Sequence, residues 1–283
     1  MLHRFRRAAA RVVQRGKRRV LLTQETANLG NFLYEWMYVW HERGRGEDAV
    51  CLLTPKMEPW LQVFGAAAEP LVVRRSDVRV TDRRVRWLHN EFGVHFGVDE
   101  LHAFAAGFVA PSGVIDPARV PPADRLTERD VLVNVRRGDY FSVEENRRNY
   151  AFDLDEYLVA ALALARTTGG PVRRLHVVSD GIAWCRTNLA WLASECDELT
   201  WEDEDLPPET HLAILSNAPR LVLANSTFSY WAGYLSAWRS GRPEWVVAPW
   251  FHIRNHEDGA AWQLDPRWSI VRDIPSHWAQ PPA

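Results

Sequence analysis

The chain has 283 residues, of which 47% are hydrophobic and 25% are charged, and its formal net charge is −2. This composition excludes a disordered chain, and the length is sufficient for one large or two small domains with hydrophobic cores. A net charge close to zero gives no overall field for nucleic acid, and the lack of any run of about 18 apolar residues argues against a membrane span.

The N-terminal segment, residues 1–16, is strongly basic and is expected to form a helix or leader. No acidic residue precedes Glu25, and eight Lys or Arg lie between Arg4 and Arg19. A basic amphipathic helix on anionic lipid, formed by residues 1–19, is one interpretation, and a solvated helix or frayed leader is the other. The segment lacks the apolar core of a secretory signal, and the three cysteines show no metal-binding spacing. We therefore expect a reduced, cytoplasmic protein, with membrane-surface contact left open.

Residues 17–109 are predicted to form an N-terminal α/β domain. A turn at residues 27–30 leads into a helix over about 31–43. Short apolar runs predict three strands, at Arg18–Thr23, Ala49–Thr54 and Leu71–Arg74. Four prolines in residues 110–128 mark a linker that ends this domain.

Residues 129–283 are predicted to form a second α/β domain, because strand and helix patterns alternate regularly along this segment. The expected strands are Asp130–Val135, Leu175–Ser179, Glu198–Trp201, Arg220–Ala224 and Trp245–Ala248. The expected helices are 153–167, 181–194, 209–217 and 228–238. Alternation of this kind predicts a parallel sheet with covering helices.

The most informative stretch is residues 131–140, in which an apolar run ends abruptly in Arg136, Arg137, Gly138 and Asp139. The run is typical of a buried parallel strand, and ligands bind at the carboxyl ends of such strands. Two arginines there offer planar, permanently charged groups suited to phosphate. The alternative is a charged turn with a surface ion pair.

Four segments, in order, resemble the α-1,2-fucosyltransferase family (glycosyltransferase family 11). Leu29-Gly30-Asn31 with Tyr34 resembles the family's Gly-Leu-Gly-Asn turn and following aromatic helix, and Asn134 to Tyr140 resembles its His-x-Arg-Arg-x-Asp motif. Val178-Ser179-Asp180 with Trp184-Cys185 resembles its Ser-Asp-Asp-x-x-Trp-Cys segment. Ala224 to Trp231 resembles its Ala-Asn-Ser-Ser/Thr-Phe-Ser-Trp-Trp segment. The chain is thereby identified as a divergent member of that family.

The resemblance implies a fold of two Rossmann-like domains facing a cleft, the GT-B type of glycosyltransferase. It implies inverting transfer of fucose from GDP-fucose to a glycan hydroxyl in α-1,2 linkage, without a metal or other cofactor. The acceptor would bind the N-terminal domain and the donor the C-terminal domain. Two alternatives remain open, namely transfer of another nucleotide-activated sugar, and a catalytically silent relative that binds a sugar or nucleotide.

The resemblance also assigns donor-binding residues. Arg136 aligns with the arginine that holds the donor's diphosphate, where preorganised charge stabilises a leaving group. Ser226 lies where a strand ends and a helix begins, so either phosphate binding or helix capping fits it. The neighbouring donor-binding candidates are Asn225, Thr227 and Phe228.

Each of the other candidate residues has two possible roles. Arg137 either contacts the donor or holds the loop, and Asp180, after Ser179, either lines the donor site or caps the following helix. Gly30 and Asn31 face the cleft if the N-terminal turn matches the family; otherwise Asn31 caps its helix.

The catalytic base is expected just beyond Arg136. Inverting transfer needs a group that accepts the proton of the acceptor hydroxyl. Related fucosyltransferases of another linkage type place a glutamate eight residues after the matching arginine, at Glu144 here. Asp139 is the equal candidate, and Glu145 lies beside them.

Two departures from the family pattern affect the nucleotide base. Asn134 replaces the motif histidine and His211 replaces an aspartate, and in related enzymes both positions face guanine. A metal-dependent alternative rests on Asp153 with Asp155 and on residues 203–205, since paired carboxylates bind Mn²⁺ or Mg²⁺. Capping of a helix by Asp153 and solvation of the acidic loop explain these residues without a metal, so no metal site is predicted.

Overall fold

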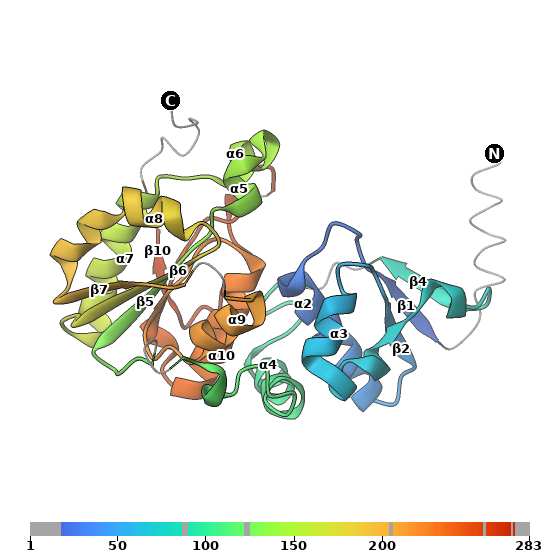
Figure 1. Cartoon of the computed structure of the whole chain (residues 1–283). Helices are drawn as coiled ribbons and strands as arrows, with labels where there is room; N and C mark the ends of the chain where they lie inside the picture. The colour runs from blue at the N-terminus through green and yellow to red at the C-terminus, as the bar shows by residue number, and fades with distance from the viewer. Residues whose placement is uncertain are drawn as a thin grey trace. The chain divides into compact units, whose positions relative to one another are not determined.

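The computed structural model describes residues 18–86, 90–121, 125–203, 206–256, 259–272 and 274. The chain divides into two compact units between Gly113 and Val114 (Figure 1), within the proline-rich segment predicted as a linker. The basic segment predicted over residues 1–16 lies outside the described residues.

The N-terminal unit is built on a parallel sheet whose strands lie in the order β3-β2-β1-β4. Its strands are β1 (Arg19–Leu22), β2 (Ala49–Leu52), β3 (Val72–Val73) and β4 (Arg83–Arg86), and its helices are α2 (Leu29–Gly44), α3 (Glu58–Phe64) and α4 (Val98–Phe104). The three predicted strands are present, each with slightly narrower bounds. Strand β4 was not predicted, because its sequence carries three exposed arginines that a sheet edge tolerates.

The core of this unit is aromatic. Trp36 of α2 is fully buried, and its ring meets the rings of Phe64 and Phe108 at 5.2 and 6.0 Å between centroids. Phe104 and Phe108 stack at 4.7 Å. Burial of each large ring removes roughly 150–250 Å² from water, so these contacts fix α2 in the unit.

The C-terminal unit contains a six-stranded parallel sheet in the order β10-β9-β8-β5-β6-β7. The strands are β5 (Asp130–Val135), β6 (Arg174–Ser179), β7 (Glu198–Trp201), β8 (Leu221–Val222), β9 (Val246–Pro249) and β10 (Ser269–Val271). The helices are α5 (Gly138–Ser142), α6 (Glu144–Tyr150), α7 (Leu154–Gly169), α8 (Ile182–Asn188), α9 (Pro208–Ser216) and α10 (Thr227–Ser240).

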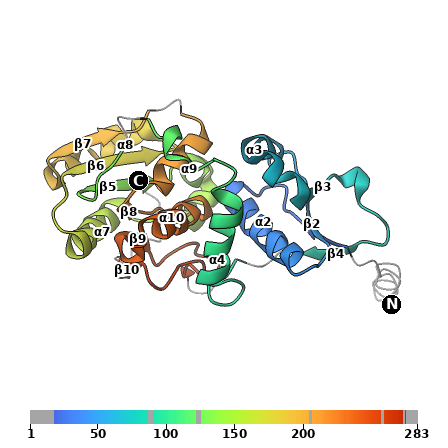
Figure 2. The ribbon, with the colours of Figure 1, turned by 90° about the horizontal axis from the view of Figure 1, so that it is seen from below.

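Helices cover both faces of this sheet. Side chains alternate along a strand, so Val131, Val133 and Val135 of β5 point to one face, where they pack with α7 and α8. Figures 1 and 2 show α9 and α10 away from α7, on the other side of the sheet. The predicted α/β class with parallel sheets is confirmed in each unit, while the predicted cleft between the units stays a prediction.

Candidate functional site

The strand order of the C-terminal unit defines where a ligand is expected. From β5 the chain continues through β6 and β7 on one side, and then returns to β8, the neighbour of β5 on the other side, before β9 and β10. This reversal is a topological switch point, and open α/β sheets bind ligands in the crevice at the carboxyl ends of such strands. Arg136 directly follows β5, and the segment after β8 leads into Ser226 and α10.

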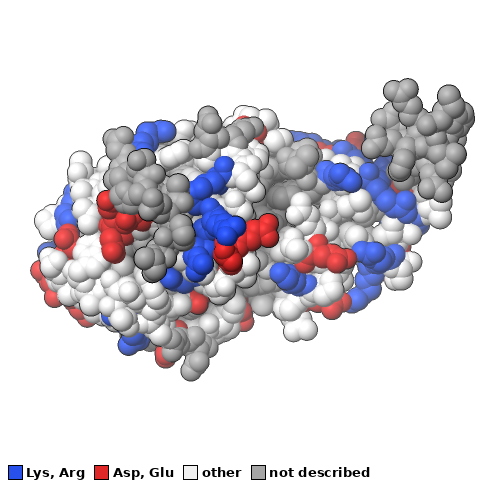
Figure 3. Space-filling model, turned by 90° about the horizontal axis from the view of Figure 1, so that it is seen from above, with Lys and Arg blue, Asp and Glu red and all other residues white. Residues whose placement is uncertain are grey.

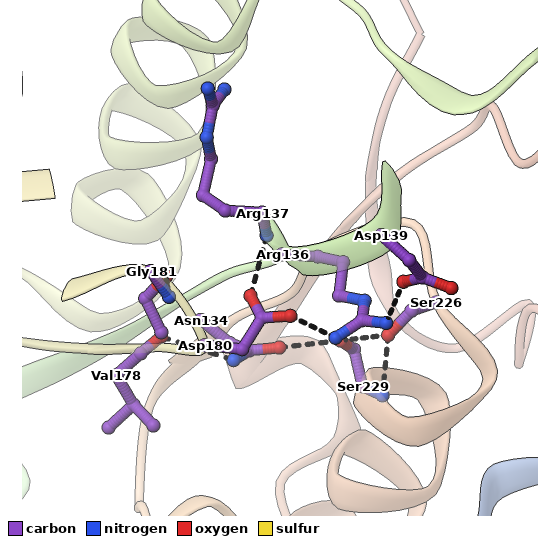
Figure 4. A network of polar contacts seen from close by, with 10 residues as sticks. Asn134, Arg136, Arg137, Asp139, Val178, Asp180, Gly181, Ser226 and Ser229 are labelled. Carbon is purple, nitrogen blue, oxygen red and sulfur yellow. Dashed lines mark hydrogen bonds and ion pairs between the residues drawn. The ribbon is translucent and has the colours of Figure 1, made fainter. Parts of the chain in front are cut away.

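Arg136 is held at this edge by two carboxylates. Its Nη2 pairs with Asp139 and its Nη1 with Asp180, which follows the neighbouring strand β6 (Figure 4). The guanidinium also lies 5.0 Å from the ring centroid of Tyr140. The Arg136 side chain is 28% exposed, so it is oriented by protein contacts and still accessible from solvent.

Arg137 points away from Arg136 (Figure 4). Its guanidinium lies 3.5 Å from the ring centroid of Phe141 and 3.5 Å from that of Trp184 in α8. Its backbone N–H donates to Asp180 Oδ1 at 2.6 Å. Of the two predicted roles for Arg137, these contacts favour holding the loop over contact with a donor.

Ser226 is the N-cap of α10. Its Oγ accepts a hydrogen bond from the Ser229 backbone N–H at 3.1 Å and lies 2.7 Å from Ser229 Oγ. The N–H groups of Thr227 and Phe228, also in the first turn, have no partner within a helix by geometry. Both of these residues are partly exposed, so the helix start presents N–H groups suited to an anion.

Asn134 lies inside the unit. Its Oδ1 accepts from Ser229 Oγ at 2.5 Å, and its Nδ2 donates to the Val178 carbonyl at 3.2 Å. The side chain therefore ties β5 to β6 and to α10, with 8% of the residue exposed. Its amide is already used on both sides, which leaves little capacity for the predicted contact with a nucleotide base.

Asn225 and Ser179 also act within the protein. Asn225 Nδ2 donates to the carbonyls of Tyr150 and His252, at 2.9 and 3.0 Å. Ser179 Oγ accepts the Gly181 N–H at 3.0 Å, closing the turn after β6. Both residues are buried, with 2% and 5% exposed, and their side chains bind protein groups next to this edge.

His252 is a buried residue that was not selected from the sequence. Its Nδ1 lies 3.1 Å from the hydroxyl of Tyr230, and its ring meets Tyr150 edge to face. Burial lowers the pKa of His252 to about 4, so the imidazole is neutral at physiological pH. His252 lies in the segment after β9, outside the sequence motifs, so the spacing of the motifs does not point to it.

The two base candidates have different surroundings. Asp139 contacts Arg136, whereas Glu144 starts α6 and pairs with Arg148 one turn later, with 66% of its side chain exposed. Figure 3 views the molecule from the side where α5 and α6 lie in Figure 1, and basic and acidic side chains stand next to each other there. Of the two, Asp139 is the one brought to Arg136.

His211 lies in the first turns of α9, and its Nε2 is buried without a hydrogen-bond partner among the described residues. Burial lowers the pKa of His211, although the nearby Glu202 and Asp180 carboxylates act in the opposite direction. Glu202 is itself buried, 3.3 Å from His176 Nε2. An orphaned polar atom of this kind is costly unless a ligand or water completes it.

The carboxylates of the metal-dependent alternative have structural partners. Asp153 Oδ1 caps α7 by accepting the Glu156 N–H at 3.0 Å, and Asp155 Oδ1 accepts from Trp191 Nε1 at 3.0 Å. Asp203 belongs to the described residues, while 204 and 205 do not. Within the part of the chain that is described, no three His, Cys, Asp or Glu side chains gather as a metal ion would need.

In the N-terminal unit, Gly30 and Asn31 lie in the first turn of α2, whose N-cap is Asn28. The same helix carries Glu35, which sequence reasoning missed. Its side chain is buried, and Thr23 Oγ1, just after β1, donates to Glu35 Oε2 at 2.5 Å. Burial raises the pKa of Glu35 to about 8, so this carboxyl is largely protonated at neutral pH.

The comparison with known proteins points to the same edge of the sheet. Residues 123–242 match the model of glycosyl transferase family 11. Over this segment the chain is similar to that family. The matched segment contains strands β5 to β8 and all of α10, and therefore Arg136, Asp180 and Ser226.

Individual proteins of known activity are moderately similar to this chain. An alpha-1,2-colitosyltransferase of Escherichia coli is 27% identical over 121 residues, 43% of this chain and 41% of the relative. Galactoside alpha-(1,2)-fucosyltransferase 1 of Sus scrofa is 31% identical over 183 residues, 63% of this chain and 44% of the relative. The chain thus spans less than half the length of these two relatives.

Among solved structures, E. coli ADP-heptose LPS heptosyltransferase II matches 92% of each chain at 11% identity and a TM-score of 0.47. A family 9 glycosyl transferase of Veillonella parvula matches 92% of this chain and 88% of its own at 10% identity and 0.43. Among the described residues, no helix is long and apolar enough to cross a bilayer.

Proposed function

We propose that this protein is an inverting α-1,2-fucosyltransferase that moves fucose from GDP-fucose to a glycan hydroxyl. The observation that carries the proposal is the placement of Arg136 after β5 and of the start of α10 after β8, on the two sides of the switch point. A fixed guanidinium and free helix N–H groups suit a diphosphate, whose charge grows as the bond to the sugar breaks.

The roles of the other residues follow from their positions. Asp139 is the better placed proton acceptor, because it is beside Arg136 while Glu144 pairs with Arg148 on an exposed helix. His211 supports a contact with the base, since its buried Nε2 has an unmet hydrogen-bonding capacity. No metal is required, because arginine and backbone N–H groups already provide the positive charge.

Localisation and acceptor are part of the same proposal. The protein acts in the cytoplasm, and the basic residues 1–19 give it an electrostatic means of approaching anionic membrane lipid. The acceptor glycan contacts the N-terminal unit. A second candidate donor carries colitose in place of fucose, because one relative is an alpha-1,2-colitosyltransferase.

The test is release of GDP from GDP-fucose with a β-galactoside acceptor, measured with and without excess chelator, beside GDP-colitose and UDP-galactose. Fucosyl transfer that persists in chelator supports the proposal. Transfer only from GDP-colitose would select the second candidate, and transfer that needs Mn²⁺ would return attention to Asp153 and Asp155. A rise in melting temperature with GDP but no turnover would indicate a silent binding relative.

A further inference from the structure

We infer that Asp180 occupies the phosphate position of the ligand-free protein and must leave Arg136 before a diphosphate binds. The inference rests on the proposed function only in taking a diphosphate as the ligand. It assigns Asp180 a role opposite to that of a donor-binding residue, because its carboxylate competes with the donor for the same groups.

The contacts of Asp180 are those that a phosphate would make. One carboxylate oxygen pairs with Nη1 of Arg136, and the other accepts the backbone N–H of Arg137 at 2.6 Å. A guanidinium and a backbone N–H converging on one anion form a typical phosphate-binding arrangement. In Figure 4 the Asp180 carboxylate lies between these two donors. The protein therefore holds its own anion at the place where the donor's charge is expected.

The loop after β5 is shaped around this carboxylate. Gly138 has a φ of +21°, and a Cβ added there would collide with the Asp180 carboxylate and lie 3.1 Å from Arg136 Nη1. Glycine at this position thus permits Asp180 to reach Arg136. Asp180 does not cap α8, whose N-cap is Gly181 without a side-chain hydrogen bond, so its contacts in the described structure serve the arginine loop.

The contact between Arg136 and Asp180 is partly exposed to solvent. The Arg136 and Asp180 side chains are 28% and 30% exposed, so the carboxylate is able to turn into water when a ligand arrives. Asp139 still pairs with Nη2, which keeps the guanidinium oriented after Asp180 leaves. When only a fraction of the protein is open, the apparent dissociation constant rises by the inverse of that fraction.

The test is titration calorimetry on the full chain with three probes: GDP, inorganic pyrophosphate and guanosine. Asp180→Asn keeps the shape and removes the charge. It is expected to bind GDP and pyrophosphate about tenfold more tightly, since hydrogen bonds to charged groups contribute on that scale, and to bind guanosine as the wild type does. Asp180→Ala serves the same purpose if the asparagine variant melts early.

Glu195→Gln is the matched control. Its ion pair with Arg166 has side-chain exposures of 29% and 35%, close to those of the Asp180 pair. Glu195 comes just before the amino end of β7, whereas Arg136 follows the carboxyl end of β5. It should leave all three affinities unchanged. Unchanged or weaker binding of GDP and pyrophosphate by both Asp180 variants would overturn the inference. Tighter pyrophosphate binding without any nucleotide binding would support it and refute the proposed donor.

Discussion

Replacement of Glu35 by glutamine should remove a pH dependence of stability that the wild-type protein shows between about pH 5 and 8. Burial raises the pKa of Glu35 to about 8, against an ordinary value of 4.5. A folded state that holds its proton more tightly than the unfolded state is favoured at low pH. The stabilisation is fully present below pH 4.5 and is lost as the pH rises through about 8.

The magnitude follows from the size of the shift. Each pKa unit corresponds to about 1.4 kcal/mol, and most of the titration window lies between pH 5 and 8. Over this range the free energy of unfolding of the wild type should therefore fall by about 3 kcal/mol relative to that of Glu35→Gln. Glutamine retains an acceptor for Thr23, which now donates to Glu35 at 2.5 Å. The two proteins should therefore be closest in shape at low pH, where both carry a neutral side chain.

The assay is urea unfolding of both proteins at pH 5, 6, 7 and 8, with Glu58→Gln as control in the same unit. Glu58 is an exposed partner of Arg74, and its replacement should leave the pH slope of the wild type intact. Parallel curves for the wild type and Glu35→Gln would refute the reasoning, because they would mean that Glu35 is ionised in the folded protein.

Two further predictions concern the donor site. Asp139→Asn should lower turnover by about 10²–10⁴, the usual loss on removing a general base, while Glu144→Gln stays close to wild type; the reverse order in initial rates would move the base to α6. His211→Ala should weaken GDP binding about tenfold through one lost hydrogen bond and leave pyrophosphate binding unchanged. Equal effects on both probes in calorimetry would show that His211 supports the site instead of reading the base.

Much of the C-terminal unit was predictable from its apolar runs. Asp130–Val135 and Glu198–Trp201 are strands with the expected bounds. The first is fully buried, and buried parallel strands need continuous β-branched or apolar residues. The same reasoning does not predict strands β4 and β10. Strand β4, in the N-terminal unit, is held at a sheet edge by backbone pairing with β1 despite its arginines. Helices α5 and α6 were not predicted because their sequences have no long apolar period.

The location of a site residue was predictable where it depends only on the position of the backbone at the end of a strand. Arg136, Asp180 and Ser226 all follow strands of one parallel sheet, so their meeting at one edge follows from topology. Side-chain direction was harder to foresee. Asn134 lies between Val133 and Val135, which face α7 and α8, so alternation turns its amide toward α10.

Long-range partners explain the remaining misses. Arg137 lies against Trp184 of α8, the helix that follows β6, and the spacing of the motifs does not show this contact. Glu35 is one of two acids in the aromatic sequence of α2, with Glu42, and only the folded unit shows that Thr23 meets it.

The central claim is that Arg136 stabilises the diphosphate leaving group of GDP-fucose. The most direct measurement is the initial rate of GDP release from GDP-fucose, with a β-galactoside acceptor, by the wild type, Arg136→Ala and Arg136→Lys. The account predicts turnover by the wild type and a loss of at least about 10²–10³ in both variants, since lysine lacks the planar, two-pronged geometry of arginine. Near-normal turnover by Arg136→Lys would contradict it.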